Sequence, residues 1–167
     1  MKYLVSMILI LLTACASQPQ PPPAHLIPYL GDWYEIIRQD HAFEEGLTNV
    51  TASYVFDQGT INVKNRGYSS FDKEWREVKG RAELASSDGH DYLKVSFFRP
   101  FYGSYVVFEL DKKSDQYALV MGLNGEHFWL LSKTPTMPKA VKNRLLARIK
   151  ALGFHMDKLV EAKHAAL

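Results

Sequence analysis

The sequence predicts an all-β fold: an eight-stranded up-and-down antiparallel β-barrel with a C-terminal α-helix packed on its wall. Three observations lead to this prediction. Between residues 33 and 133, eight short segments alternate apolar and polar residues and are rich in β-branched and aromatic side chains. Links rich in Gly, Asn, Asp and Ser, which tolerate turn conformations, separate these segments. After residue 136 the apolar residues recur at helical spacing.

Each alternating segment is long enough for one strand. Sequential strands joined by short links lie side by side, and closing the sheet removes the edges that invite aggregation. The links are 57–59, 86–89, 111–115 and 124–125. The expected strands are Trp33–Gln39, Asn49–Phe56, Thr60–Arg66, Trp75–Leu84, Tyr92–Phe97, Ser104–Leu110, Gln116–Met121 and His127–Ser132.

The last periodic segment predicts an amphipathic helix. Thr136 is the expected N-cap, Pro138 suits the first turn, and Gly153 can end the helix. We expect the apolar stripe to pack on the barrel wall. A helix lying on a membrane surface is the alternative, but the stripe is narrow for that role. The stripe consists of Val141, Leu145, Ile149 and Leu152.

The first 14 residues have the composition of a secretory signal peptide. Lys2 precedes an apolar run from Leu4 to Leu12, which is shorter than the roughly 20 residues of a membrane-spanning helix. The following residues, Leu12-Thr13-Ala14-Cys15, resemble a bacterial lipobox. This resemblance implies that Cys15, the single cysteine of the chain, becomes the acylated first residue of the mature protein. The alternative is an ordinary signal peptide followed by an unrelated cysteine.

An acylated Cys15 has consequences for the rest of the chain. It leaves no thiol for a disulfide, so packing alone must hold the fold. Several acyl chains on one residue give stable membrane anchoring. Ala16 stands where an aspartate would signal inner-membrane retention, which favours the outer membrane with the domain facing the periplasm. Residues 15–28 are rich in Pro and Gln and predict an extended tether, so the globular domain is 29–167.

The net charge of the chain limits the classes of partner that we expect. Removal of Lys2 with the leader lowers the formal net charge from +2 to about +1. A nearly neutral domain lacks the strongly basic face that nucleic-acid binding needs, so we expect no nucleic-acid partner. The mature chain of about 150 residues suits one domain with a sizeable core.

Four segments resemble the lipocalins. The stretch 29–36 holds the G-x-W signature as Gly31-Asp32-Trp33, directly before the first predicted strand. Residues 117–122 are similar to the seventh lipocalin strand, and 128–135 to the eighth strand and its link to the helix. Residues 96–103 look very like the bacterial outer-membrane lipocalins close to apolipoprotein D. The resemblance covers Leu26 to about Val160 and implies a barrel that holds one small apolar ligand.

The family pattern also assigns a closed end to the barrel. Gly31 and Trp33 belong to it, and the family usually carries an arginine over this tryptophan. Here the matching residue is Lys133, which can stack on the indole but lacks the planar fork of arginine. We expect these residues to plug the barrel rather than to touch ligand.

Alternation and the family pattern together predict which side chains face the interior. The set is mostly apolar, and small residues such as Ala52, Gly80, Ala82 and Ala118 leave volume for a ligand. Tyr54, Tyr105, Asn65 and His127 can hydrogen-bond a head group or simply be satisfied core residues. The inward phase of the fourth and sixth strands depends on bulges. The predicted ligand-binding lining is Val50, Ala52, Tyr54, Phe56, Ile61, Val63, Asn65, Val78, Leu93, Val95, Phe97, Tyr105, Val107, Ala118, Val120, His127, Trp129 and Leu131, with Gly80 and Ala82 beside them.

The loops 39–48, 67–74, 98–103 and 122–126 frame the expected open mouth. Its aromatic side chains favour an amphiphile that enters tail first, or a contact between two copies in a homodimer. Arg99, Lys73, Arg66 and Arg76 can meet a phosphate or carboxylate. The predicted mouth residues are Phe43, Tyr68, Phe71, Phe98, Arg99, Phe101 and Tyr102.

The sequence therefore predicts a lipid-binding lipoprotein rather than an enzyme. Its expected ligands are fatty acids, phospholipids or, as the family implies, lysophospholipids, bound for storage, transport or repair of the envelope. No catalytic motif is present, and we expect no metal and no cofactor. The alternatives are a structural or interaction lipoprotein with an occluded barrel, a haem carrier that uses His127, and an undetected catalytic triad.

Overall fold

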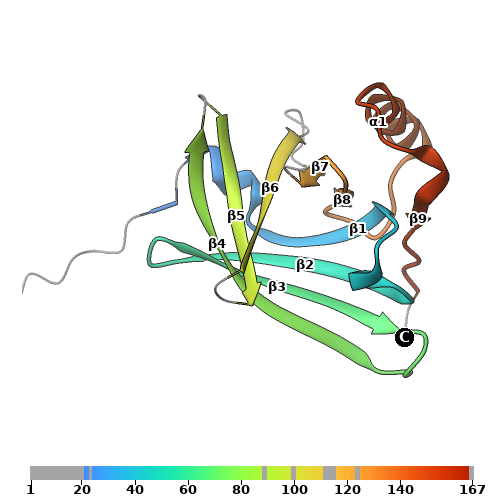
Figure 1. Cartoon of the computed structure of the whole chain (residues 1–167), viewed down its shortest axis with the longest axis horizontal. Coiled ribbons are helices and arrows are strands. Elements are labelled where there is room, and N and C mark those ends of the chain that lie inside the picture. Colours follow the sequence, from blue (N-terminus) through green and yellow to red (C-terminus); the bar gives the residue numbers. More distant parts are fainter. Residues whose placement is uncertain are drawn as a thin grey trace, which may run out of the picture.

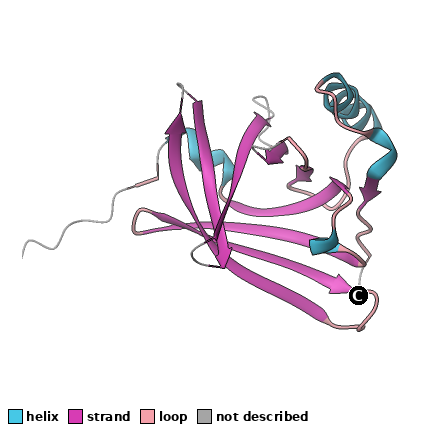
Figure 2. Cartoon of the chain, in the orientation of Figure 1, coloured by secondary structure: helices cyan, strands magenta, loops and turns pink. Residues whose placement is uncertain are grey.

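The computed structural model describes residues 21–22, 24–87, 90–98, 101–110, 116–122 and 125–165. The predicted signal peptide, Cys15 and Arg99 lie outside these residues. Most of the described chain is strand, and one α-helix lies on the outside of the curled sheet (Figures 1 and 2). This arrangement confirms the predicted fold class.

All eight predicted strands are present, and a short ninth follows the helix. The 3₁₀ segments are η1 (Ala24–Tyr29), η2 (Ala42–Glu44) and η3 (Met156–Lys158), and the helix is α1 (Lys139–Ala151). The strands are β1 (Gly31–Gln39), β2 (Leu47–Asp57), β3 (Thr60–Ser69), β4 (Trp75–Ser87), β5 (His90–Phe98), β6 (Phe101–Leu110), β7 (Tyr117–Gly122), β8 (Phe128–Ser132) and β9 (Leu159–Glu161).

Strand β1 closes the barrel because it changes partner along its length. The sheet runs from β2 through β8 to β1, and β1 also pairs with β2. The first residues of β1 pair with β2, from Gly31 opposite Tyr54 to Tyr34 opposite Thr51. The remaining residues pair with β8 across a register shift between Glu35 and Ile37. Strand tilt and stagger of this kind are what a closed barrel requires.

The C-terminal segment was not predicted beyond the helix. Strand β9 adds to the outer side of β1, with Arg38 opposite Val160. Three further backbone bonds hold this segment: the amide of Asp40 donates to Lys158 O at 2.7 Å, that of Asn49 to Lys163 O at 2.8 Å, and that of Ala162 to Ile36 O at 2.9 Å. The chain after α1 therefore returns to the barrel and ties the helix to it.

The hydrophobic core has an outer and an inner part. The outer part joins α1 to the barrel wall: Leu145 and Ile149 are buried against Ile37 and Phe128 of β1 and β8. This confirms the predicted packing of the helix on the wall. The inner part fills the barrel around Trp33, which is fully buried.

One local prediction was wrong. Thr136 is not the N-cap, because the residue before a proline is disfavoured in helical conformation and Met137 precedes Pro138. The helix starts at Lys139, with Pro138 at the cap position and no side-chain cap bond. Its C-terminus follows the prediction, since Gly153 has φ +90° just after the helix.

The C-terminal end of the predicted tether is a 3₁₀ segment that packs on the barrel. Residues 24–28 belong to η1, which runs onto the barrel because Tyr29 is buried there and Trp33 Nε1 donates to Tyr29 O at 2.7 Å.

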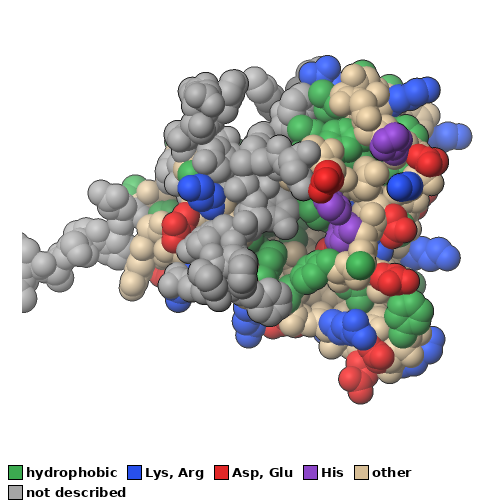
Figure 3. All heavy atoms as spheres, viewed as in Figure 1, with side chains coloured by type: hydrophobic (Ala, Val, Ile, Leu, Met, Phe, Trp, Pro, Cys, Tyr) green, Lys and Arg blue, Asp and Glu red, His purple; other side chains and the backbone are tan. Residues whose placement is uncertain are grey.

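The surface carries both signs of charge. Figure 3 shows Lys, Arg, Asp and Glu side chains intermixed over the described part of this face. This pattern agrees with the nearly neutral net charge of the chain.

Candidate ligand-binding cavity

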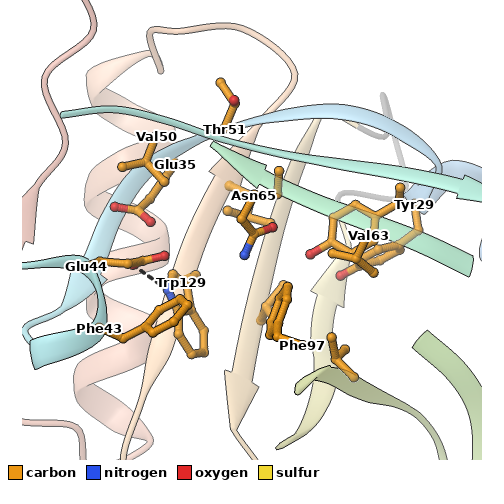
Figure 4. Close-up of a pocket in the computed structure, with 15 residues that line it drawn as sticks. Tyr29, Glu35, Phe43, Glu44, Val50, Thr51, Val63, Asn65, Phe97 and Trp129 are labelled. Carbon is orange, nitrogen blue, oxygen red and sulfur yellow. Dashed lines mark hydrogen bonds between the residues drawn. The ribbon is translucent and has the colours of Figure 1, made fainter. Parts of the chain in front are cut away.

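A narrow cavity lies inside the barrel between η2 and η1 (Figure 4). Its volume is about 70 Å³. A single buried water needs about 10–15 Å³, whereas pockets that bury whole ligands usually reach several hundred cubic ångströms. A ligand larger than a few atoms must therefore displace wall side chains as it enters. A long, thin ligand requires less displacement than a wide one.

Most of the cavity lining was predicted from alternation along the strands. These positions share an inward phase on β2, β3, β5, β7 and β8, and Phe43 joins them from η2. Their role in ligand binding stays a prediction. The predicted residues that line the cavity are Val50, Ala52, Tyr54, Val63, Asn65, Val95, Phe97, Val120, Trp129 and Leu131.

Other predicted lining residues pack in the barrel core and do not line this cavity. Phe56, Ile61 and Ala82 pack on one another near the closed end, where the barrel interior is filled. Ala118 packs beside Trp33 in the same region. Neighbouring side chains pack against Ala82 and Ala118, and a role for these residues in ligand binding stays a prediction.

Three more predicted residues lie at the edges of the cavity. Val78 lines an adjoining hollow of about 360 Å³ next to η2, which shares Phe43, Glu44, Val50 and Asn65 with the cavity. Gly80 lies against the Ser96 carbonyl and the Phe97 ring, and a Cβ there would come within 2.6 Å of that carbonyl oxygen. His127 is half-buried, and its ring stacks on Trp129 at 6.2 Å between centroids.

Several predicted residues fall on side chains that the structure does not describe. Their strands are in place on β5 and β6, but no contact is assigned to their side chains. They are Leu93, Phe98, Phe101, Tyr102, Tyr105 and Val107.

Four lining residues were missed: Tyr29, Glu35, Glu44 and Thr51. Glu35 could have been found, because it shares the inward phase of Trp33 two residues earlier. Thr51 reaches the cavity beside Val50 because the β2–β3 register shifts between Thr48 and Thr51. Tyr29 and Glu44 lie outside regular strands, so alternation carries no signal for them.

The missed glutamates belong to a buried charged cluster at the η2 end of the cavity. Arg38 Nη1 donates to Glu35 Oε1 at 2.6 Å, and Arg38 Nη2 donates to the Glu44 carbonyl at 2.8 Å. Trp129 Nε1 donates to Glu44 Oε2 at 3.2 Å, and His41 Nε2 lies 3.2 Å from the same oxygen. Arg38 thus faces two carboxyl groups, and His41 contacts one of them.

The pKa values of the two carboxyl groups shift in opposite directions. Burial, reinforced by the neighbouring Glu44 charge, raises the pKa of Glu35 to about 8. Burial also acts against ionisation of Glu44, but the His41 and Trp129 hydrogen bonds and the Arg38 charge together hold the pKa of Glu44 below its usual value. At neutral pH the cluster therefore holds a protonated Glu35 beside an Arg38–Glu44 ion pair.

At the closed end of the barrel, the predicted residues Lys133 and Trp33 contact each other. Lys133 Nζ lies 3.9 Å from the centroid of the Trp33 ring and donates to the Leu30 carbonyl at 2.7 Å. Gly31 has φ +90° in the lead-in to β1, a conformation that favours glycine. The lysine thus reaches one backbone carbonyl, where the fork of an arginine can reach several.

The rim around η2 carries exposed aromatic side chains. Phe43 is 57% exposed and Phe71 is 66% exposed. Phe71 follows β3 and lies against Gly46, where a Cβ would collide with the ring. Tyr68 belongs to β3 itself and packs edge-on against Trp75 at 5.7 Å.

Two of the basic residues expected to meet an anion have partners of their own. The guanidinium of Arg66 lies 3.8 Å from the centroid of the Trp75 ring, and Arg76 forms an ion pair with Asp72. Lys73 lies in the turn between β3 and β4 with φ 61°.

The fold and cavity define a small-ligand-binding barrel, and the comparisons agree. A family model described as a lipocalin-like domain matches residues 25–164. The chain therefore belongs to the lipocalin family. It is 46% identical to the outer membrane lipoprotein Blc of Vibrio cholerae, over 90% of this chain and 91% of that protein. It is 27% identical to mouse apolipoprotein D, over 90% of this chain and 82% of that protein.

A solved structure shows the same fold at lower identity. Lobster apocrustacyanin A1 superposes with a TM-score of 0.68 and 18% identity, over 83% of this chain and 79% of that one.

The relatives also bear on location. Bacterial relatives at 42–46% identity are named as outer membrane lipoproteins, which confirms the predicted outer-membrane location. None of the helices in the described ranges has the length and apolar character needed to cross a bilayer.

Proposed function

We propose that this lipoprotein binds the acyl chain of a fatty acid, phospholipid or lysophospholipid inside its barrel, and acts by reversible burial rather than catalysis. The observation that carries the proposal is the narrow, mostly apolar cavity that starts beside Phe43 at the rim and reaches Tyr29. Burial of each methylene contributes about 0.8 kcal/mol, so a chain that enters lengthwise gains affinity with every carbon.

The shape of the cavity favours a linear tail over a flat ring. A tail one methylene wide can enter by small rotations of Phe43, Phe97 and Trp129. A haem would have to displace most of the lining. His127, the candidate haem ligand, packs against the rings of His41 and Trp129. These contacts favour an acyl chain over haem as the ligand.

The membrane and the cavity act together in this proposal. Acylation of Cys15 holds the domain at the outer membrane, facing the periplasm, while the head group of the bound lipid stays at the rim near Phe43 and Phe71. Envelope maintenance, through storage, transport or repair of lipids, is the corresponding role. The exposed rim aromatics also favour a homodimer contact, and native mass spectrometry reports both its mass and any retained lipid.

The test uses the mature chain from residue 15 with Cys15→Ser, so that added lipid is the only lipid in the assay. We expect a fluorescent fatty acid to bind one per barrel, and lysophospholipid to displace it. Ala52→Phe fills the cavity and is expected to weaken binding at least about tenfold. Val55→Phe is the matched control, because Val55 lies on the same strand and is 56% exposed outside the barrel.

A second function is favoured by one observation, the small cavity volume of about 70 Å³. A barrel filled by its own side chains would serve as an interaction lipoprotein. Failure of every amphiphile to bind the unsubstituted protein would support this second function and would contradict the first.

A further inference from the structure

Two polar atoms in the wall of the cavity have no hydrogen-bond partner within the described part of the chain: Tyr29 Oη and Asn65 Oδ1. Tyr29 is only 3% exposed, and the Asn65 oxygen is buried as well. Both side chains line the same cavity, Tyr29 from η1 and Asn65 from β3 (Figure 4). Buried polar groups in native proteins are almost always paired, so these two atoms need an explanation.

A plain acyl chain would leave both atoms unsatisfied. Both atoms are buried from solvent. A saturated tail beside them offers neither a donor nor an acceptor. Sites whose buried polar groups are left without partners in this way discriminate strongly against the apolar analogue.

Tyr29 Oη and Asn65 Oδ1 need different hydrogen-bond partners. Burial, with a smaller effect from Tyr54, raises the pKa of Tyr29 well above its usual value, so the phenol keeps its proton and can donate. Asn65 Oδ1 can only accept. A hydroxyl group serves either atom because it both donates and accepts, a ketone serves only Tyr29, and a methylene serves neither.

We propose that the cavity selects acyl chains that carry a hydroxyl group along the tail, with Tyr29 and Asn65 as the residues that determine this specificity. The proposal rests on the proposed function and names the substrate class of that same site.

The strand register indicates where on the tail the hydroxyl lies. Tyr54 pairs with Gly31 at the closed end and with Val63 of β3. Asn65 pairs with Ala52, two residues nearer the rim, which is about 7 Å along the strand. Both polar atoms thus lie beyond the charged cluster at η2. The preferred hydroxyl is therefore in the inner part of the tail, away from the carboxylate.

The experiment is a competition series against a bound fluorescent fatty acid, with the mature Cys15→Ser chain. The competitors are octadecanoic acid and its isomers hydroxylated near the carboxylate, at mid-chain and near the methyl end, with the matching keto acids. We expect one inner position to bind about tenfold more tightly than octadecanoic acid. The isomer hydroxylated near the carboxylate shows no such gain.

Two variants distinguish the contributions of Tyr29 Oη and Asn65 Oδ1 to the ligand preference. Tyr29→Phe keeps the ring and the backbone carbonyl that Trp33 binds, so the closed end is preserved. It is expected to abolish the preference for the keto acid, which only Tyr29 can serve, and to reduce that for the hydroxy acid. Asn65→Leu is expected to reduce the preference for the hydroxy acid and to leave that for the keto acid. Tyr117→Phe, on β7 but packed on the outer core and outside the cavity lining, is the control that changes neither.

The inference is overturned if octadecanoic acid binds as tightly as every hydroxylated isomer, or if Tyr29→Phe and Asn65→Leu both retain the preference. Failure of all the acids, plain and hydroxylated, to displace the probe would contradict the proposed function as well. Binding without selectivity would contradict this inference alone.

Discussion

Replacing Glu35 by glutamine is expected to remove a pH dependence of stability between pH 5 and 8. Burial raises the pKa of Glu35 from 4.5 to about 8. In that window the folded protein keeps the proton while the unfolded chain loses it, so stability is full below pH 4.5 and falls as the pH rises to 8. Glu44 acts in another window: its lowered pKa contributes stability above pH 4.5 that is lost on acidification.

The size of the effect follows from the shift. Each pH unit inside the window costs about 1.4 kcal/mol, so the unsubstituted protein loses about 3–4 kcal/mol of unfolding free energy between pH 5 and 8 from this group. Glutamine matches the protonated acid in shape, and its carbonyl can still accept from Arg38. The Glu35→Gln curve is therefore expected to be flat over this range, apart from contributions common to both proteins.

The assay is urea unfolding at each pH for the unsubstituted chain, Glu35→Gln and Glu83→Gln. Glu83 is an exposed glutamate of β4, and its replacement serves as the matched control. Curves for the unsubstituted protein and Glu35→Gln that run parallel within about 0.5 kcal/mol from pH 5 to 8 would refute the reasoning.

The remaining predictions concern the closed end and the helix. Lys133→Met keeps the aliphatic stem but removes the charge over Trp33 and the bond to Leu30 O; urea unfolding should show a loss of about 1–3 kcal/mol. Lys133→Arg should retain stability, and equal losses in both variants would contradict a role for the charge. Ile149→Ala opens a cavity under α1 and should cost about 2–5 kcal/mol in the same assay. Asn143→Ala, at an exposed position of that helix, should change stability by less than about 0.5 kcal/mol.

The strands and the helix could be predicted because their signals are local. Alternation and turn residues identify each strand, and the apolar stripe with Gly153 identifies the helix and its end. The short strand β9 carries no such signal, since three residues cannot show a period. It forms because the chain after α1 meets the free side of β1, more than 100 residues earlier in sequence.

In the candidate site too, some residues could be predicted from local patterns and others could not. Apolar wall residues such as Val63 and Val120 follow from alternation, because a strand that faces a core must place every second side chain inward. The cluster of Glu35, Arg38 and Glu44 does not follow from it, because its contacts depend on how η2 folds back over the barrel.

By itself the sequence determined the class of fold, the family and the apolar character of the interior, since period, turn chemistry and the G-x-W segment are properties of neighbouring residues. Only the tertiary structure decided how narrow the interior is and which polar atoms, above all Tyr29 Oη and Asn65 Oδ1, lie in it without hydrogen-bond partners among the described residues. Volume and hydrogen-bond satisfaction are properties of packing between segments far apart in the chain. No local pattern encodes them.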